Sequence, residues 1–178
     1  VVVLATVYDG PADVGERITQ PLRKFGEPLL DLSGAMPYRV LQTAYDALFP
    51  KGRDRCYWKS TYLKGLDNGV IKNITAYLAK RPSEMTYASI WKFGGAVQRI
   101  PADATAFGDR SMPFMLSLDA IWTSPTDDQA NMSWVRSVWQ GMQRHSTGRM
   151  YLNFPGLGDG ENLVRDAYGS EPYTKLKK

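Results

Sequence analysis

The segment Cys56–Leu63, with the sequence CYWKSTYL, decides the predicted fold class. It is rich in aromatic residues, which favour strands, and successive side chains of a strand point to opposite faces. Polar and apolar residues occur on both faces, whereas a parallel strand covered on both faces usually reads as a continuous apolar run. We therefore predict an antiparallel sheet, in which this strand presents Cys56, Trp58, Ser60 and Tyr62 on one face and Tyr57, Lys59, Thr61 and Leu63 on the other.

The rest of the chain alternates between predicted strands and helices. Helical spacing of apolar residues is clearest over Asp127–Met142, where one stripe holds Trp134, Val135, Val138, Trp139 and Met142. Pro21 is expected to kink or restart the first helix. Further strands are predicted at Val1–Tyr8, Met85–Phe93, Ser111–Trp122 and Tyr151–Phe154, and further helices from Pro11 to Gly26, over Tyr38–Phe49, from Asp67 to just before Pro82, and over Leu163–Tyr168.

These elements predict an α/β (α+β) fold, with an antiparallel sheet and helices packed on one of its faces. The other face would stay open toward a ligand or a second domain. On the alternation of each strand taken alone, we expect that open face to include Lys59, Met115, Ser117 and Asp119.

Composition narrows the class of protein. The 178 residues suffice for one domain with a real core, and the longest apolar runs are too short to cross a bilayer. The net charge of +4 is spread along the chain, so no nucleic-acid partner is expected. A single cysteine, Cys56, and a single histidine, His145, allow neither an internal disulfide nor a Cys/His metal site. No signal segment is visible, and we expect a cytoplasmic protein.

Both ends of the sequence predict truncation. Val1 begins inside an apparent strand without an initiator methionine, and Lys178 ends an amphipathic segment that has no capping signal after it. We therefore expect residues 1–178 to be one domain cut from a longer polypeptide.

A series of short motifs in a fixed order carries a family resemblance. The series is Tyr57-Trp58-Lys59-Ser60, Gly94-Gly95-Ala96-Val97, Asp103–Phe107, Arg110, Trp122, Trp134, Tyr151-Leu152-Asn153-Phe154 and Tyr168-Gly169. It resembles the substrate-binding domain of the berberine bridge enzyme-like FAD-linked oxidases, and the resemblance spans essentially the whole chain. It implies an FAD-dependent oxidoreductase whose FAD-binding domain belongs to the same polypeptide but lies outside this chain. This chain would cover the flavin and shape the pocket for a small-molecule substrate, whose alcohol or amine carbon gives a hydride to flavin N5.

The resemblance also implies roles for individual residues. Tyr151 matches the family's tyrosine above the substrate and is the candidate catalytic residue, Asn153 matches the residue whose side chain approaches the flavin, and Gly94 and Gly95 would lie near the cofactor. A phenol, with an ordinary pKa near 10, needs a neighbouring cation or hydrogen bond to act as a base. The alternative for Tyr151 is a tyrosine packed in the core of the sheet.

Two positions depart from the family pattern. Ser117 lies five residues before Trp122, where relatives often carry Gln or Glu, and Met115 replaces a residue that is commonly polar. Ser117 is kept as a second catalytic candidate, although the polar function would then have to move to Tyr151 or a domain partner. Both residues would otherwise fill an interdomain seam. The candidate substrate-binding residues are Lys59, Met115, Trp58 and Trp91, whereas Trp134 and Trp139 are expected in the core.

A second class of function stays open. An oxidase-derived domain that has lost its flavin half could act as a stand-alone binding module for a small molecule or a protein, and the altered Ser117 motivates this alternative. Arg110 is expected to be structural, with the adjacent Asp109 as a possible ion-pair partner. His145 is expected in a surface turn.

Overall fold

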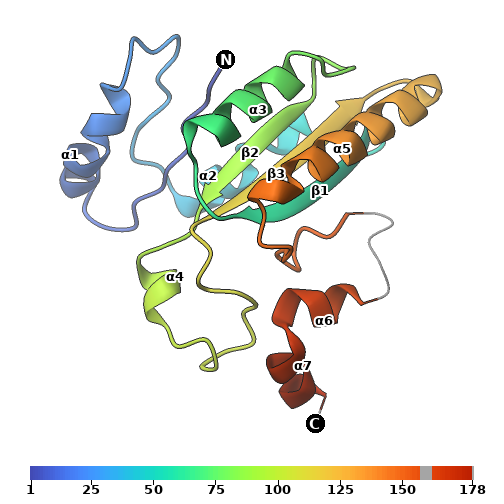
Figure 1. The fold of residues 1–178 in the computed structure, drawn as a ribbon. Helices are drawn as coiled ribbons and strands as arrows, with labels where there is room; N and C mark the ends of the chain where they lie inside the picture. The colour runs from blue at the N-terminus through green and yellow to red at the C-terminus, as the bar shows by residue number, and fades with distance from the viewer. Residues whose placement is uncertain (157–161, 178) are drawn as a thin grey trace. The chain divides into compact units, whose positions relative to one another are not determined.

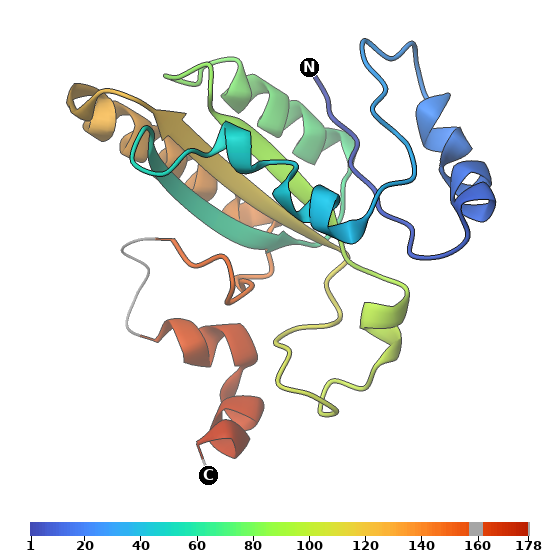
Figure 2. The ribbon, with the colours of Figure 1, turned by 180° about the vertical axis from the view of Figure 1, so that it is seen from behind.

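The computed structural model describes residues 1–156 and 162–177 and divides them between two compact units, residues 1–50 and the remainder from residue 51 (Figures 1 and 2). The first unit contains α1 (Ala12–Arg23), α2 (Tyr38–Thr43) and a short 3-10 helix, η1 (Asp46–Leu48). The predicted strand Val1–Tyr8 is wrong: the segment has no regular secondary structure, and residues 1–50 contain no strand that could bond to it. A strand requires a hydrogen-bonded neighbour, which strand propensity alone does not supply.

The helices of the first unit also differ from expectation. α1 begins after Pro11 as predicted and continues through Pro21 to Arg23, because a proline removes only one backbone donor and Pro21 lies close to the end of the helix. The predicted helix Tyr38–Phe49 divides into α2 and η1, with a turn between Thr43 and Asp46.

A three-stranded antiparallel sheet forms the centre of the second unit, which confirms the predicted sheet type. It consists of β1 (Arg55–Leu63), β2 (Tyr87–Lys92) and β3 (Phe114–Trp122), in the order β1-β3-β2. Two helices, α3 (Asn68–Leu78) and α5 (Asp128–Met142), cover one face of this sheet (Figure 1).

The hydrophobic core lies between the sheet and these two helices. Asp67 caps the start of α3, because its carboxylate accepts a hydrogen bond of 2.9 Å from the Val70 amide. The stripe predicted on α5 is confirmed, with Trp134 and Trp139 at its margin, and burial of each large apolar side chain contributes about 1.5–3 kcal/mol. The buried cluster holds Tyr57, Leu63, Val70, Ile74, Leu116, Leu118, Ala120, Trp122, Val135, Val138 and Met142.

Contrary to the prediction, the register of the sheet shows that Lys59 does not share a face with Met115, Ser117 and Asp119. Lys59 pairs with Leu118 and therefore shares the helix-covered face, where its ammonium lies 4.6 Å from the centre of the Trp139 ring. Trp58 pairs with Asp119 and Ser60 with Ser117, on the opposite face. Odd-numbered positions of β1 thus face the same way as even-numbered positions of β3, which alternation within each strand cannot reveal.

The C-terminal part of the second unit follows the free edge of β1. Ser146 bridges Leu63, and the Tyr62 amide donates to the Arg149 carbonyl at 3.1 Å. The predicted strand Tyr151–Phe154 is wrong: the segment is a turn, in which the Phe154 amide donates to the Tyr151 carbonyl at 2.9 Å. Four further short elements are α4 (Ala96–Arg99), η2 (Pro125–Asp127), η3 (Gln143–His145) and α7 (Ser170–Leu176), and the predicted helix α6 (Leu163–Tyr168) is confirmed.

The predicted loop Pro155–Gly160 lies largely outside the described residues. Across the described ranges, no helix combines the length and apolar character needed to cross a membrane.

Candidate functional site

Aromatic rings gather around Tyr151, on the turn that follows the edge of β1. The Tyr151 ring lies 6.0 Å from Phe93, 5.5 Å from Phe107 and 6.1 Å from Phe154, measured between ring centres. Phe93 directly follows β2 and is held there by a hydrogen bond of 2.8 Å from its amide to the Pro113 carbonyl. The turn thus places Tyr151 against residues that come from two other parts of the chain.

The structure brings Tyr151 and Asn153 together. The Asn153 amide nitrogen donates a hydrogen bond of 2.8 Å to the Tyr151 phenol oxygen. Both residues line a hollow of about 120 Å³, whose other walls are Ala106, Phe107, Gly108, Met150, Leu152, Ala167 and Tyr168. Tyr151 is half-buried and Asn153 is exposed, so the alternative of a buried core tyrosine does not describe this arrangement.

Tyr62 belongs to the same cluster, although the sequence did not mark it as a site residue. Its ring meets Phe93 edge to face at 6.0 Å, and its side chain is fully buried. Among the described residues its hydroxyl has no hydrogen-bond partner. Burial raises the pKa of Tyr62, and the charges of Asp109 and Tyr151 raise it further. The alternation of β1 placed Tyr62 on this face, but nothing in the sequence indicated an unpartnered hydroxyl.

The glycine pair follows Phe93 and so adjoins the aromatic cluster. Gly95 has φ +54° and ψ −121°, a conformation that favours glycine, and it begins α4. A Cβ atom on Gly94 would come no closer than 3.6 Å to the Lys92 side chain, so no close contact within the chain requires glycine there.

Three rows of side chains cross the sheet on the face away from α3 and α5. The first row is Trp58, Asp119 and Tyr87, the second is Ser60, Ser117 and Ser89, and the third is Tyr62, Met115 and Trp91. Four of the predicted site residues therefore share this face, namely Trp58, Trp91, Met115 and Ser117. Lys59 does not, because it lies on the helix-covered face.

The serine row joins the sheet to the Tyr151 turn. Ser60 Oγ donates to the Phe154 carbonyl at 2.8 Å, and the Phe154 ring lies 5.8 Å from Trp91. Ser117 Oγ is buried and makes no well-formed hydrogen bond within the described part of the chain. Ser117 is therefore an unsatisfied hydroxyl at the centre of the face.

Asp119 is the one carboxyl group in these three rows, and its pKa is shifted. Its burial raises its pKa to about 6, and the neighbouring Ser117 hydroxyl opposes that rise. Burial also raises the pKa of Tyr87, with a further contribution from the charge of Asp119. Sequence alternation predicted Asp119 on the open face, but its burial depends on how neighbouring strands surround it.

Arg110 has the predicted structural role. Its guanidinium donates to the Val97 carbonyl at 3.2 Å and lies 4.6 Å from the centre of the Phe107 ring, which in turn contacts Tyr151. Asp109 pairs with Arg149 at 3.0 Å and not with Arg110.

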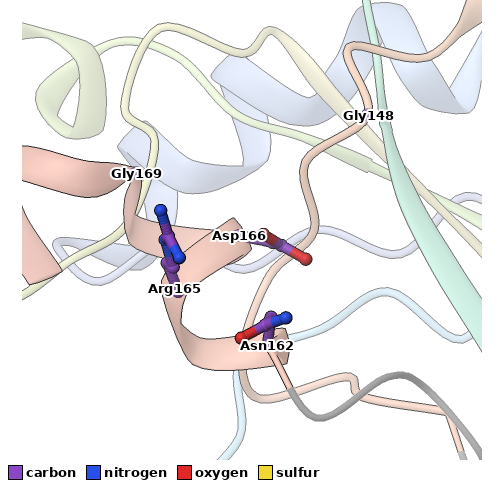
Figure 3. Close-up of a pocket in the computed structure, with 5 residues that line it drawn as sticks. All are labelled: Gly148, Asn162, Arg165, Asp166 and Gly169. Carbon is purple, nitrogen blue, oxygen red and sulfur yellow. The ribbon is translucent and has the colours of Figure 1, made fainter.

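A second hollow, of about 370 Å³, lies at the start of α6 (Figure 3). It is lined by Gly148, Asn162, Arg165, Asp166 and Gly169. Residues 1–156 and 162–177 hold no group of three or more His, Cys, Asp or Glu side chains that could bind a metal ion.

Known proteins similar to this chain are FAD-linked enzymes. The chain is 27% identical over 176 residues to an uncharacterised FAD-linked oxidoreductase of Bacillus subtilis, YgaK, which covers 96% of the chain. It is 31% identical to Berberine bridge enzyme-like 17 of Arabidopsis thaliana over 39% of the chain and 14% of that protein. These relatives confirm the resemblance to the berberine bridge enzyme-like FAD-linked oxidoreductases. No family model matches the sequence.

A further relative and a solved structure extend this similarity. Hexose oxidase of Chondrus crispus is 25% identical over 75% of the chain and 24% of its own length. A solved structure of a variant of berberine bridge enzyme has the same fold, with a TM-score of 0.63 and 17% identity over 81% of this chain and 32% of that one. The present chain spans 38% of YgaK, so it corresponds to well under half of that relative.

The berberine bridge enzyme-like resemblance implies FAD, and the residues of the candidate site fit such a group. An isoalloxazine ring combines flat apolar faces with polar edges. The aromatic cluster offers ring surfaces, and the buried hydroxyl of Tyr62 lacks a hydrogen-bond partner among the described residues. The exposed Asn153 amide adds a donor and an acceptor beside them.

Proposed function

We propose that this chain is the substrate-binding part of an FAD-dependent oxidoreductase that oxidises an alcohol or amine carbon of a small molecule. The observation that carries the proposal is the hydrogen bond of 2.8 Å between Asn153 and the Tyr151 phenol, at a hollow rimmed by aromatic rings. The name of YgaK, an FAD-linked oxidoreductase, supports the flavin. This chain spans 38% of that relative, which supports a further, FAD-binding domain in the same polypeptide as its partner.

In this proposal Asn153 and the backbone around Gly95 would hold the flavin, and the Tyr62 hydroxyl would supply a polar partner in the sheet. A bound FAD would supply the acceptor for a hydride from the substrate carbon. The protein then has to orient that carbon and manage the proton of its hydroxyl or amine group.

Tyr151 is the residue proposed to take this proton. A base must lie within hydrogen-bond reach of the group that it deprotonates, and the half-exposed Tyr151 lines the hollow in which a ligand would bind. The Asn153 donor stabilises negative charge on that oxygen. Phe93, Phe107 and Phe154 fix the orientation of the ring by packing around it.

The substrate class proposed is a hydroxylated ring compound. Hexose oxidase is named for a sugar substrate, and the face described here combines half-exposed Trp58 and Trp91 rings with hydroxyl groups. Aromatic faces and hydrogen-bonding groups together suit sugar rings, which have both apolar and polar surfaces.

The experiment that tests the proposal is expression of the intact reading frame that contains this chain, followed by visible spectroscopy. We expect a yellow protein whose flavin absorbance is bleached under anaerobic conditions by a hexose or a related alcohol. A protein that purifies with no flavin, or a flavin that keeps its absorbance with every alcohol and amine tested, would contradict it.

A further inference from the structure

The face that carries the candidate site has a negative charge at the end remote from Tyr151. In the three rows that cross the sheet, Asp119 is the one carboxylate among the paired residues, and the rows contain no lysine or arginine. Asp119 is partly buried, and it takes part in no ion pair among the described residues. Removing an ionised carboxylate from water is unfavourable unless a partner compensates.

The residues beside Asp119 would favour a positive partner. Trp58 pairs with Asp119 across β1 and Tyr87 pairs with it across β2, and their side chains are 37% and 39% exposed. Aromatic faces attract cations, most strongly where water is partly excluded. A carboxylate flanked by two accessible aromatic side chains is thus complementary to an ammonium group.

The Ser117 hydroxyl is a second observation that indicates a ligand. It is fully buried at the centre of the serine row, next to Asp119 on the same face, and it lacks a well-formed hydrogen bond within the described residues. Buried hydroxyls are normally hydrogen-bonded in native proteins. A polar ligand lying along this face would supply the missing partner.

The distance between the two ends limits the size of such a ligand. The Met115 row adjoins the Tyr151 cluster through Tyr62, and Asp119 lies four residues further along β3, which corresponds to about 13 Å in an extended strand. A ligand that reaches both ends is therefore longer than one sugar ring.

We propose, building on the proposed function, that Asp119 with Trp58 and Tyr87 binds an ammonium group of the substrate, and that Ser117 bonds to the substrate between that group and the carbon oxidised near Tyr151. The substrate is then a hydroxylated, amine-bearing molecule of about the length of a disaccharide. Asp119 acts as a specificity-determining residue, because it selects the charged end and takes no part in the oxidation.

Isothermal titration calorimetry on the intact polypeptide tests this assignment. The probes are cellobiose and the glucosamine disaccharide with free amino groups, which have the same linkage and differ in the charged group. Titrations run at pH 7 with any flavin chemically reduced, so that heat reports binding and not turnover. We expect the amino disaccharide to bind at least tenfold more tightly than cellobiose.

Three variants sharpen the test. Asp119→Asn should abolish the preference for the amino disaccharide, whereas Asp119→Glu should keep part of that preference. Asp103→Asn, which removes an exposed carboxylate outside the three rows, should leave the preference unchanged. In the wild type the preference should also fall between pH 7 and pH 5, because Asp119, with a pKa of about 6, becomes protonated.

The assignment would be overturned if the wild type binds both disaccharides with equal affinity or binds neither. It would also be overturned if the preference for the amino disaccharide survives in Asp119→Asn. Anaerobic bleaching of the oxidised flavin is recorded separately. If the amino disaccharide is preferred but no alcohol or amine bleaches the flavin, the binding assignment stands and the proposed oxidation fails. If a hexose bleaches the flavin but the preference for the amino disaccharide is absent, the proposed oxidation stands and the binding assignment fails.

Discussion

The Asn153 amide nitrogen lies 2.8 Å from the Tyr151 phenol oxygen, two residues earlier in the same turn. The turn is closed by the hydrogen bond from the Phe154 amide to the Tyr151 carbonyl, so the positions of both side chains are linked. A hydrogen-bond donor held against a phenol oxygen stabilises the negatively charged form of that oxygen, which is the form that can accept a proton. This hydrogen bond is the basis of the role proposed for Tyr151.

Asn153→Ala tests this pairing directly. Loss of the donor should slow flavin reduction by the substrate about tenfold, which corresponds to one hydrogen bond to a charged group. Asn162→Ala, in the hollow at the start of α6, is the matched control and should leave the rate within about twofold. Stopped-flow absorbance under anaerobic conditions measures both, and equal rates in Asn153→Ala and the wild type would contradict the pairing.

Gly95→Ala should destabilise the protein, whereas Gly94→Ala should not. Gly95 has φ +54° and ψ −121°, where a side chain introduces backbone strain of about 1–3 kcal/mol. A Cβ on Gly94 meets only ordinary contacts, at 3.6 Å or more from Lys92, and its φ is not positive. Thermal unfolding of the two variants measures the difference. Equal melting temperatures would show that the conformation at Gly95 is not required.

Asp119→Asn should stabilise the fold at neutral pH. Because burial raises the pKa of Asp119 to about 6, the folded state binds more protons than the unfolded state between about pH 4 and 6, and stability falls as the pH rises through that range. Ionised Asp119 therefore costs at most about 3 kcal/mol at pH 7, and the neutral amide avoids most of that cost.

The check is urea unfolding of the wild type and Asp119→Asn at pH 4 and pH 7. The variant should gain stability over the wild type at pH 7 and lose most of that advantage at pH 4, where the wild-type carboxyl is protonated in the folded state. An advantage of the same size at both pH values would mean that charge burial is not its cause.

Asp67→Ala should destabilise α3. The Asp67 carboxylate accepts from the Val70 amide at 2.9 Å, and loss of such an N-cap costs about 1 kcal/mol. Asp67→Asn keeps an acceptor oxygen and should lose much less stability. Denaturant unfolding compares the two variants, and an equal loss in both would point to charge and not to the capping hydrogen bond.

Local patterns predicted much of the second unit. β1, β2, β3, α3 and α5 were expected close to their observed bounds, because each has a clear period and a recognisable start or end. The strand predicted at Val1–Tyr8 has the right composition but no hydrogen-bonded neighbour within residues 1–50. Strand formation depends on pairing partners that composition does not specify.

Local sequence patterns predicted less of the candidate site than of the fold. The position of Lys59 was wrong because the faces of two strands can be matched only when their register is known, and the pairing Lys59 with Leu118 reverses the expected match. Tyr151–Phe154 is short enough for turn hydrogen bonds to override its aromatic character. The burial of Tyr62, Ser117 and Asp119 comes from tertiary packing, which no local motif encodes.

The most direct test of the central claim compares Tyr151→Phe with Tyr168→Phe in the intact flavoprotein. Both side chains line the same hollow, and the Tyr168 hydroxyl donates to the Ala106 carbonyl at 3.0 Å, away from the proposed chemistry. If Tyr151 takes the substrate proton, anaerobic flavin reduction should slow by about 100-fold or more in Tyr151→Phe and stay within about threefold in Tyr168→Phe. Near wild-type reduction in Tyr151→Phe, with the flavin still bound, would contradict the account.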